Sequence, residues 1–215
     1  MRGLFASYGE LALLDPGGNL VLFRIAEYVA QRKAGQLVDH QGNLIHGAAY
    51  VHPTAQVRNS IIGSGASVHE FTTVRDSLID ANSVIGHCSE VARSIIGARA
   101  SVPRFNYVGG SILGSEVRLG GCVSIASRRF DQGHISIRYG SERYFTDQPK
   151  MGALIGDETM VGFGSHVNPG VIIGRRCLIG PYCDVRRDIP DDYVIVVDQK
   201  LAARPRQRED FHARR

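Results

Sequence analysis

The sequence predicts an all-β protein, a parallel β-helix in which every coil has three flat sides. Four consecutive segments, which begin at Val57, Val74, Val91 and Val108, align with one another at a constant period of seventeen. Within each segment an aliphatic residue recurs at spacings of six, six and five. An α-helix has no period of six, whereas three short strands and turns per coil account for all three spacings.

The recurring aliphatic positions identify the interior of the predicted solenoid. They are Ile62, Val68, Val74, Ile79, Ile85, Val91, Ile96, Val102, Val108, Leu113, Leu119 and Ile125. The series extends back to Ile45 and continues, after a gap, from Ile155 to Val185. We expect these side chains to point inward and to stack on their equivalents one coil away, ~4.8 Å along the axis. Glycines such as Gly97 follow many of them and suit corners where a side chain would obstruct the neighbouring coil.

Two segments outside the repeat have patterns of their own. Residues 18–35 place apolar side chains at helical spacing and predict an amphipathic helix, which we expect to cover the open end of the solenoid. Residues 126–152 break the repeat, and "HISIRYGSERYFT" alternates around Gly140-Ser141 like a β-hairpin. The predicted organisation is an N-terminal helical cap (1–44), a β-helix (45–195) with a hairpin excursion (126–152), and a basic C-terminal tail (196–215).

The composition excludes several classes of protein. No apolar run approaches the ~18 residues of a membrane helix, and the first residues lack a secretory pattern, so we expect a cytoplasmic protein that does not contact a membrane. The formal net charge is +4, and five Arg among the last fifteen residues explain most of it. Such an arm is most often a solvated terminus, so nucleic acid is not an expected partner. The four Cys form no CxxC pair, and we expect no metal site.

Three stretches carry a narrower resemblance to a known family. They read "SIIGARASVPRFNYVGGSILG", "ASRRFDQG" and "KMGALIGDETMVGFGSHVNPGVIIGRRCLIGPYC". Over roughly residues 45–195 the chain resembles the acetyltransferase domain of the bifunctional sugar-1-phosphate nucleotidylyltransferase/acetyltransferases, the enzymes that make UDP-N-acetylglucosamine. The resemblance implies a left-handed parallel β-helix of hexapeptide repeats, acetyl-CoA as co-substrate and a homotrimer. It also implies that Phe163, Gly164 and Gly180 contact the coenzyme.

The chain departs from this family at its catalytic turn. The family reads Pro-His-Leu-Asn-Tyr-Val-Gly-Asp with the His as general base, whereas this chain reads "PRFNYVGG" from Pro103 and so carries Arg104 at the base position. A guanidinium stays protonated at working pH and is no general base, although it can hold an anionic group. Further on, "ASRRFD" places Ser127 where the family has a substrate-contacting Asn.

The repeat offers another candidate base. His87 precedes Arg104 by one full period and therefore occupies the equivalent position one coil away. One hypothesis is that His87 abstracts the proton of the attacking amine, with Arg104 as its electrostatic partner. The alternative is that His87 is an ordinary polar residue of the solenoid face.

The remaining candidate residues follow from the resemblance. Glu90, Asn106 and Tyr107 fall at positions where the family contacts the sugar, and Arg75 falls near a phosphate-binding Arg. Arg128 and Arg129 begin the excursion and are candidates for binding a phosphate of the substrate or coenzyme. The expected function is an acyl-CoA-dependent acyltransferase that acts on an amino-sugar phosphate or a nucleotide sugar. The alternative is a catalytically inactive trimeric binding or regulatory protein that retains the ligand pocket.

Overall fold

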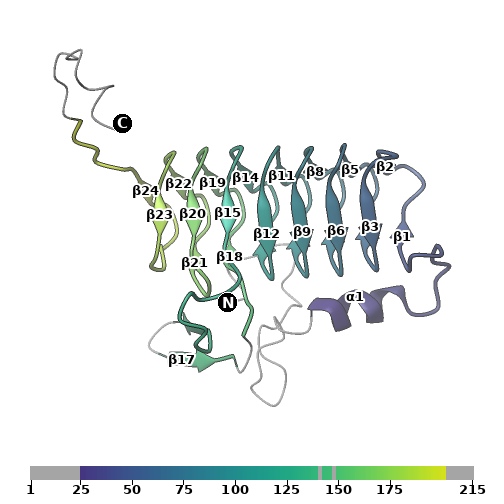
Figure 1. Cartoon of the computed structure of the whole chain (residues 1–215), viewed down its shortest axis with the longest axis horizontal. Coiled ribbons are helices and arrows are strands. Elements are labelled where there is room, and N and C mark those ends of the chain that lie inside the picture. Colours follow the sequence, from purple (N-terminus) through teal and green to yellow (C-terminus); the bar gives the residue numbers. More distant parts are fainter. Residues whose placement is uncertain (1–24, 140–141, 147–148, 202–215) are drawn as a thin grey trace, which may run out of the picture.

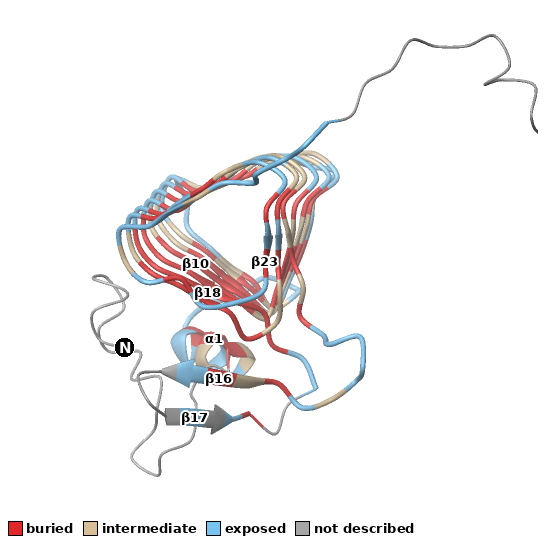
Figure 2. Ribbon diagram, turned by 90° about the vertical axis from the view of Figure 1, so that its left-hand side faces the viewer, coloured by how far each residue is buried: buried red, intermediate tan, exposed pale blue. Residues whose placement is uncertain are grey.

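The computed structural model describes residues 25–139, 142–146 and 149–201, and within them the chain forms a left-handed parallel β-solenoid (Figure 1). Its coils stack along one axis, and their strands build three flat parallel sheets that enclose a triangular core (Figure 2). The fold class predicted from the repeat is confirmed. None of the helices in these residues is long and apolar enough to cross a membrane.

Each sheet receives one strand from nearly every coil. The first sheet consists of β1 (Leu44–Ile45), β4 (Ile61–Ile62), β7 (Leu78–Ile79), β10 (Ile95–Ile96), β13 (Ile112–Leu113), β18 (Leu154–Ile155) and β21 (Ile172–Ile173). The second consists of β2 (Tyr50–Val51), β5 (Ser67–Val68), β8 (Val84–Ile85), β11 (Ser101–Val102), β14 (Arg118–Leu119), β19 (Met160–Val161), β22 (Leu178–Ile179) and β24 (Val194–Ile195). The third consists of β3 (Gln56–Arg58), β6 (Thr73–Arg75), β9 (Glu90–Ala92), β12 (Tyr107–Gly109), β15 (Ser124–Ile125), β20 (His166–Val167) and β23 (Asp184–Val185).

The strand register reproduces the sequence period. Ile79, Ile96 and Leu113 are successive partners in the first sheet, one period apart, and all three are fully buried. After the excursion the period first lengthens by one residue, so that Ile155 pairs with Ile173, and in the last coil it shortens, so that Ile179 pairs with Ile195. The predicted corners are also tight, because a Cβ on Gly97 would stand 2.5 Å from the backbone of Gly114 in the next coil. The predicted inward stacking of aliphatic side chains is therefore confirmed.

Buried serines form a ladder at the corner between the third and first sheets. Ser77 donates its hydroxyl to the carbonyl of Arg75 (2.7 Å) and accepts the backbone N–H of Ser94 (3.0 Å). Ser60, Ser94 and Ser111 make the equivalent pair of bonds in their own coils. Each hydroxyl thus satisfies a backbone N–H for which the short corner offers no carbonyl partner, and it donates in turn to a carbonyl of its own coil.

The outer face of the first sheet is covered by two elements (Figure 2). Its outward side chains include Leu78, Ile95, Ile112, Leu154 and Ile172, all buried. Helix α1 (Ile25–Lys33) buries Ile25 and Val29 against this apolar face, and the hairpin segment buries Ile135 and Ile137 there. The helix therefore lies along the side of the solenoid instead of covering its open end, because this face is the one that water would otherwise contact. Residues 18–24 of the predicted helix lie outside the described residues, as do residues 202–215 of the tail.

The predicted hairpin is confirmed. Strands β16 (Ser136–Tyr139) and β17 (Glu142–Phe145) are antiparallel, with Tyr139 opposite Glu142 and Ser136 opposite Phe145. The two turn residues, Gly140 and Ser141, lie outside the described residues. The excursion thus leaves the solenoid after β15 and packs beside the first sheet before the repeat resumes at β18 (Figure 1).

Candidate functional site

An open groove on the third sheet brings several of the predicted site residues together. We call it the Tyr107 groove, and it is lined by Phe71, Thr73, Cys88, Ser89, Glu90, Phe105, Asn106, Tyr107, Val123 and Ser124. Its floor is a column of outward residues from successive coils, since Thr73, Glu90, Tyr107 and Ser124 are partners in register. Outward positions alternate with the buried aliphatic ones along each strand, so every coil contributes one polar side chain to the same stripe.

Two contacts fix the polar side chains of this groove. The guanidinium of Arg75 donates to the Glu90 carboxylate at 2.7 Å, and both side chains are partly exposed. The hydroxyl of Tyr107 hydrogen-bonds the buried hydroxyl of Ser127 at 3.2 Å. The Tyr107 ring also lies over Gly109, where a Cβ would stand 2.6 Å from the tyrosine oxygen. Arg75 and Ser127 therefore support Glu90 and Tyr107, respectively, on the floor of the groove.

Asn106 is only 3% exposed, and its amide holds the neighbouring turn. The amide nitrogen donates to the carbonyls of Pro103 (3.0 Å) and Arg104 (3.3 Å). The amide oxygen accepts the backbone N–H of Val123 in the next coil (2.8 Å). These three bonds use most of the side chain's hydrogen-bonding capacity, so its geometry supports a structural role for Asn106 under the groove.

His87 and Arg104 lie at the corner beside the groove and are not part of its lining. The carbonyl of His87 accepts the backbone N–H of Phe105 (3.2 Å), and the His87 and Phe105 rings meet edge to face with centroids 5.3 Å apart. Arg104 is exposed and lies against the corner of the next coil at Gly121. Its Cγ is 3.6 Å from the position that a Cβ on Gly121 would occupy. His87 and Arg104 thus occupy equivalent positions of adjacent coils, as the period predicts. Phe105, which contacts the His87 ring, also lines the Tyr107 groove.

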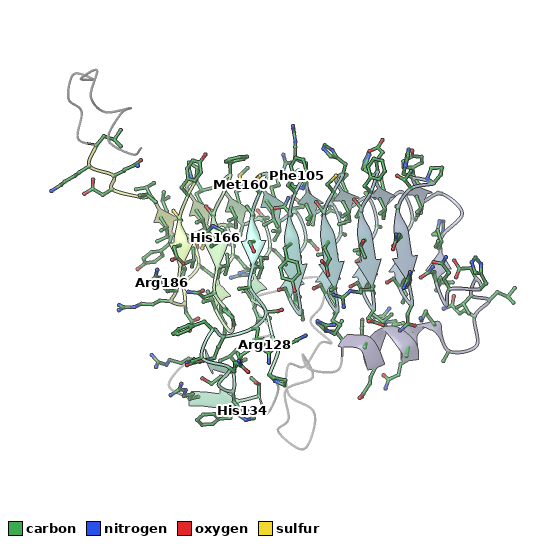
Figure 3. All side chains as sticks on the ribbon, viewed as in Figure 1. Phe105, Arg128, His134, Met160, His166 and Arg186 are labelled. Carbon is green, nitrogen blue, oxygen red and sulfur yellow. The ribbon has the colours of Figure 1, made fainter. Side chains whose placement is uncertain are left out.

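The three residues expected to contact the coenzyme fall in two places. Phe163 and Gly164 lie farther along the corner that carries Phe105, and the Phe163 ring contacts the Tyr182 ring at a centroid distance of 5.7 Å. Gly164 has a positive φ of 68°, and the Tyr182 ring covers it. Gly180 lines a separate apolar groove on the second sheet, together with Gly120, Met160 and Leu178. Figure 3 shows that Phe105 and Met160 both point outward along the top of the solenoid.

Arg128 and Arg129 do not line the Tyr107 groove. Figure 3 shows Arg128 on the loop that leads from the solenoid to the hairpin. The guanidinium of Arg129 donates hydrogen bonds from two nitrogens to the carboxylate of Asp131, and the Nε–Oδ1 distance is 2.8 Å. That ion pair and the backbone N–H of Gly133 lower the pKa of Asp131 to about 2.

The Asp131 pKa gives a direct test of this ion pair. Substitution R129Q is expected to return the pKa of Asp131 from about 2 toward its ordinary value of 3.8, as measured by carboxyl-carbon NMR over an acid titration. Because the folded-state pKa is depressed, the pair's stabilisation is present above the unfolded pKa and is lost as the pH falls toward about 2. Substitution R128Q is the matched control and should leave the Asp131 titration unchanged; an unchanged titration in R129Q would contradict the pairing.

Several residues of the groove were missed by sequence reasoning. Phe71 (68% exposed) and Phe105 (54% exposed) flank it, and both have a positive φ. They belong to a column with Cys88 and Cys122 that repeats at the same period as the core. The signal was therefore present in the sequence, since Cys88 and Phe105 directly follow His87 and Arg104 at the same period.

Comparison with known proteins supports the class of fold and the resemblance drawn from the sequence. The GMPPB C-terminal domain family matches residues 40–131, and the family described as bacterial transferase hexapeptide (six repeats) matches residues 152–186. The fold is thus a left-handed parallel β-solenoid, and one part of it matches a family of hexapeptide repeats. The bifunctional protein GlmU of Methanocaldococcus jannaschii is 32% identical over 85 residues, which are 39% of this chain and 21% of the relative. The chain therefore matches only about a fifth of that relative's length.

The solved structures that match the chain are more distant in sequence. A variant of perosamine N-acetyltransferase from Caulobacter crescentus, in complex with CoA and GDP-perosamine, is 19% identical, with a TM-score of 0.31; 85% of this chain and 65% of that one are covered. A variant of the N-acyltransferase AntD from Bacillus cereus, in complex with dTDP and coenzyme A, is 17% identical, with a TM-score of 0.42; the coverage is 76% and 84%.

Proposed function

We propose that this protein is an acyltransferase that moves an acyl group, acetyl in the simplest case, from acyl-CoA to the amino group of an amino-sugar phosphate or a nucleotide sugar. The observation that carries the proposal is the Tyr107 groove, which gathers Glu90 and Tyr107, with Arg75 and Ser127 behind them, on one face of a hexapeptide-repeat solenoid. Carboxylate and phenol groups at the base of an open groove suit the hydroxyls of a sugar.

The reaction is direct transfer. The acceptor nitrogen attacks the thioester carbonyl carbon, the C–S bond breaks, an amide forms, and CoA leaves as the thiol with the proton that the amine lost. Positioning two substrates side by side contributes much of the rate in reactions of this kind. The apolar groove that contains Gly180 suits the pantetheine arm, and Phe163 with Gly164 lies at the neighbouring corner.

We assign the base to His87 and the electrostatic role to Arg104. The half-buried imidazole of His87 is held edge-on against Phe105, and imidazole is the side chain that most often serves as a general base. Arg104 stays charged and is suited to an anionic group or to the developing charge on the thioester oxygen. Arg128, on the loop that leads to the hairpin, is assigned to a substrate phosphate supplied across a subunit contact. We also propose that the protein is a cytoplasmic homotrimer, in line with the resemblance.

Thiol release tests the proposal. The full chain would be mixed with acetyl-CoA and a panel of amino-sugar phosphates and nucleotide amino sugars, and free thiol would be recorded with time. Acceptor-dependent release is the expected result, and E90Q should reduce it because the groove loses the charge that Arg75 orients. V84A, on the second sheet, is the control and should retain the wild-type rate. No release in the presence of acceptors that demonstrably bind would contradict the proposal.

A second candidate function rests on the same residues. Arg104 cannot accept a proton, and the amide of Asn106 and the hydroxyl of Tyr107 are already engaged within the chain. These features favour a catalytically inactive binding or regulatory protein that retains the ligand groove. Ligand binding without thiol release is the outcome that would select it.

A further inference from the structure

A second, strongly basic pocket lies where the hairpin meets the last coils. Five arginines line it, namely Arg129, Arg138, Arg143, Arg186 and Arg187. Its lining contains a single carboxylate, that of Asp188, among the residues that the structure describes. The pocket shares no described residue with the Tyr107 groove. Figure 3 shows Arg186 projecting from the last coils at the end of the molecule where the hairpin lies. We call this site the arginine pocket.

The hairpin places two of these arginines in direct opposition. Arg138 of β16 and Arg143 of β17 are register partners, and directly opposed residues of an antiparallel pair share one face of the hairpin. Their face is opposite to that of Ile137, which is buried against the first sheet. Like charges across a strand pair destabilise it, so the pair is costly unless an anion lies between the two guanidinium groups.

Neighbouring contacts hold the walls of the pocket in place. The Nε of Arg143 donates to the Ser136 hydroxyl (2.8 Å), and the same guanidinium lies over the Phe145 ring, 5.3 Å from its centroid. On the opposite wall Asp188 accepts the backbone N–H of Ile172 (2.8 Å), which ties the segment that carries Arg186 and Arg187 to the preceding coil. These contacts fix Arg143 on one wall and the backbone of the segment with Arg186 and Arg187 on the other.

The hairpin also approaches the solenoid closely at Gly170. This residue has a positive φ of 78°, and a Cβ there would stand 2.8 Å from the carbonyl oxygen of Ser136. Glycine at this corner thus permits β16 to lie directly against the coil that follows the excursion. The close approach is what brings Arg138 and Arg143 to the segment with Arg186 and Arg187.

The charges within the pocket are only partly balanced. Arg129 pairs with Asp131, and Arg186 pairs with Asp184. Within the described parts of the chain, no ion pair forms at the other three arginines, which are Arg138, Arg143 and Arg187. Burial raises the pKa of Asp188, while the Ile172 N–H and the charge of Arg138 act in the opposite direction. One carboxylate, that of Asp188, therefore accompanies three arginines that have no ion-pair partner among the described residues.

We propose that the arginine pocket binds the diphosphate group of a nucleotide. Guanidinium groups bind phosphate oxygens with two nitrogens at once, and a diphosphate presents enough oxygens for several such forks. The opposed Arg138 and Arg143 would hold the anion from the hairpin, and Arg187 would hold it from the last coil. This proposal does not depend on acyl transfer, because it concerns binding at residues that the Tyr107 groove does not use.

Calorimetric titration of the full chain with inorganic pyrophosphate tests the proposal. Wild-type protein is expected to bind pyrophosphate, with an affinity that falls as salt rises. R138Q, R143Q and R187Q should each weaken binding about tenfold or more, as expected for loss of a charge-assisted hydrogen bond. R99Q removes an exposed arginine that is paired with Glu116 at another corner, and it should leave the affinity unchanged. Circular dichroism would confirm that each variant is folded.

Three results would overturn the proposal. The first is that the wild type does not bind pyrophosphate, and the second is that the three variants bind it as tightly as the wild type does. The third is that sulfate competes as well as pyrophosphate, which would indicate only a basic surface. Two further titrations, with CoA and with a set of nucleoside diphosphates, identify the source of the diphosphate. Because thiol release is not the readout, failure here would leave the acyl-transfer proposal untouched, and the reverse also holds.

Discussion

Substitution H87A is expected to lower the rate of acyl transfer by ~10²- to 10⁴-fold, the usual contribution of a general base. The loss should fall on kcat with little change in KM, because His87 lies outside the lining of the Tyr107 groove. The acidic limb of the pH–rate profile should also disappear, since that limb reports protonation of the base. Steady-state kinetics of thiol release over a range of pH provides the measurement.

H69A is the matched control for this experiment. His69 lies at the same corner in the preceding coil, where it contacts the Tyr50 ring, and is not assigned to the reaction. A full rate in H87A combined with a large loss in E90Q would transfer the role of base from His87 to Glu90. R104A separates the two members of the proposed pair: it should lower the rate but retain the acidic limb of the profile, because the base His87 is still present.

Substitution I96A is expected to reduce the free energy of unfolding by ~2–5 kcal/mol, the range for truncating a buried aliphatic side chain. Ile96 is fully buried and stacks between Ile79 and Leu113 of the adjacent coils, so the cavity would open in the middle of the core. Denaturation in urea, at one fixed protein concentration, measures the change.

V84A is the control for this second prediction. Val84 belongs to the second sheet but points outward and is 37% exposed, so its truncation should cost well under the value for Ile96. I95A adds a useful contrast, because Ile95 is buried in the cluster beneath helix α1 and the hairpin and not inside the solenoid. Equal losses in V84A and I96A would contradict the inward stacking of the core.

The solenoid itself could be predicted because its signal occurs three times in every coil. Ile62, Val68 and Val74 are successive inward residues, and all are fully buried. The outward aliphatic column of the first sheet, which includes Ile95 and Ile112, recurs only once per coil and is therefore a much weaker signal. That column decides where helix α1 packs. Because its signal is weak, the helix was expected at the open end of the solenoid, whereas the structure places it along the side.

The site was predictable to the extent that it follows the same period. Glu90 and Tyr107 are one period apart and fall in one column of the third sheet. The hydrogen bonds of Asn106 could not be predicted, because they depend on the path of the turn at Pro103 and on the height of the next coil. The arginine pocket joins the hairpin to the last coils, and no periodicity relates those two segments. Of this pocket, only the opposition of Arg138 and Arg143 follows from the hairpin that the sequence predicts.

The serine ladder and the strand register make each coil before the excursion a nearly interchangeable module. Duplicating the coil that contains β13, β14 and β15 would preserve the pairing, and it would move the arginine pocket ~4.8 Å farther from the Tyr107 groove. The separation of the two sites can therefore change only in whole steps. A ligand that binds both sites at once must therefore have a length that matches the number of coils between them.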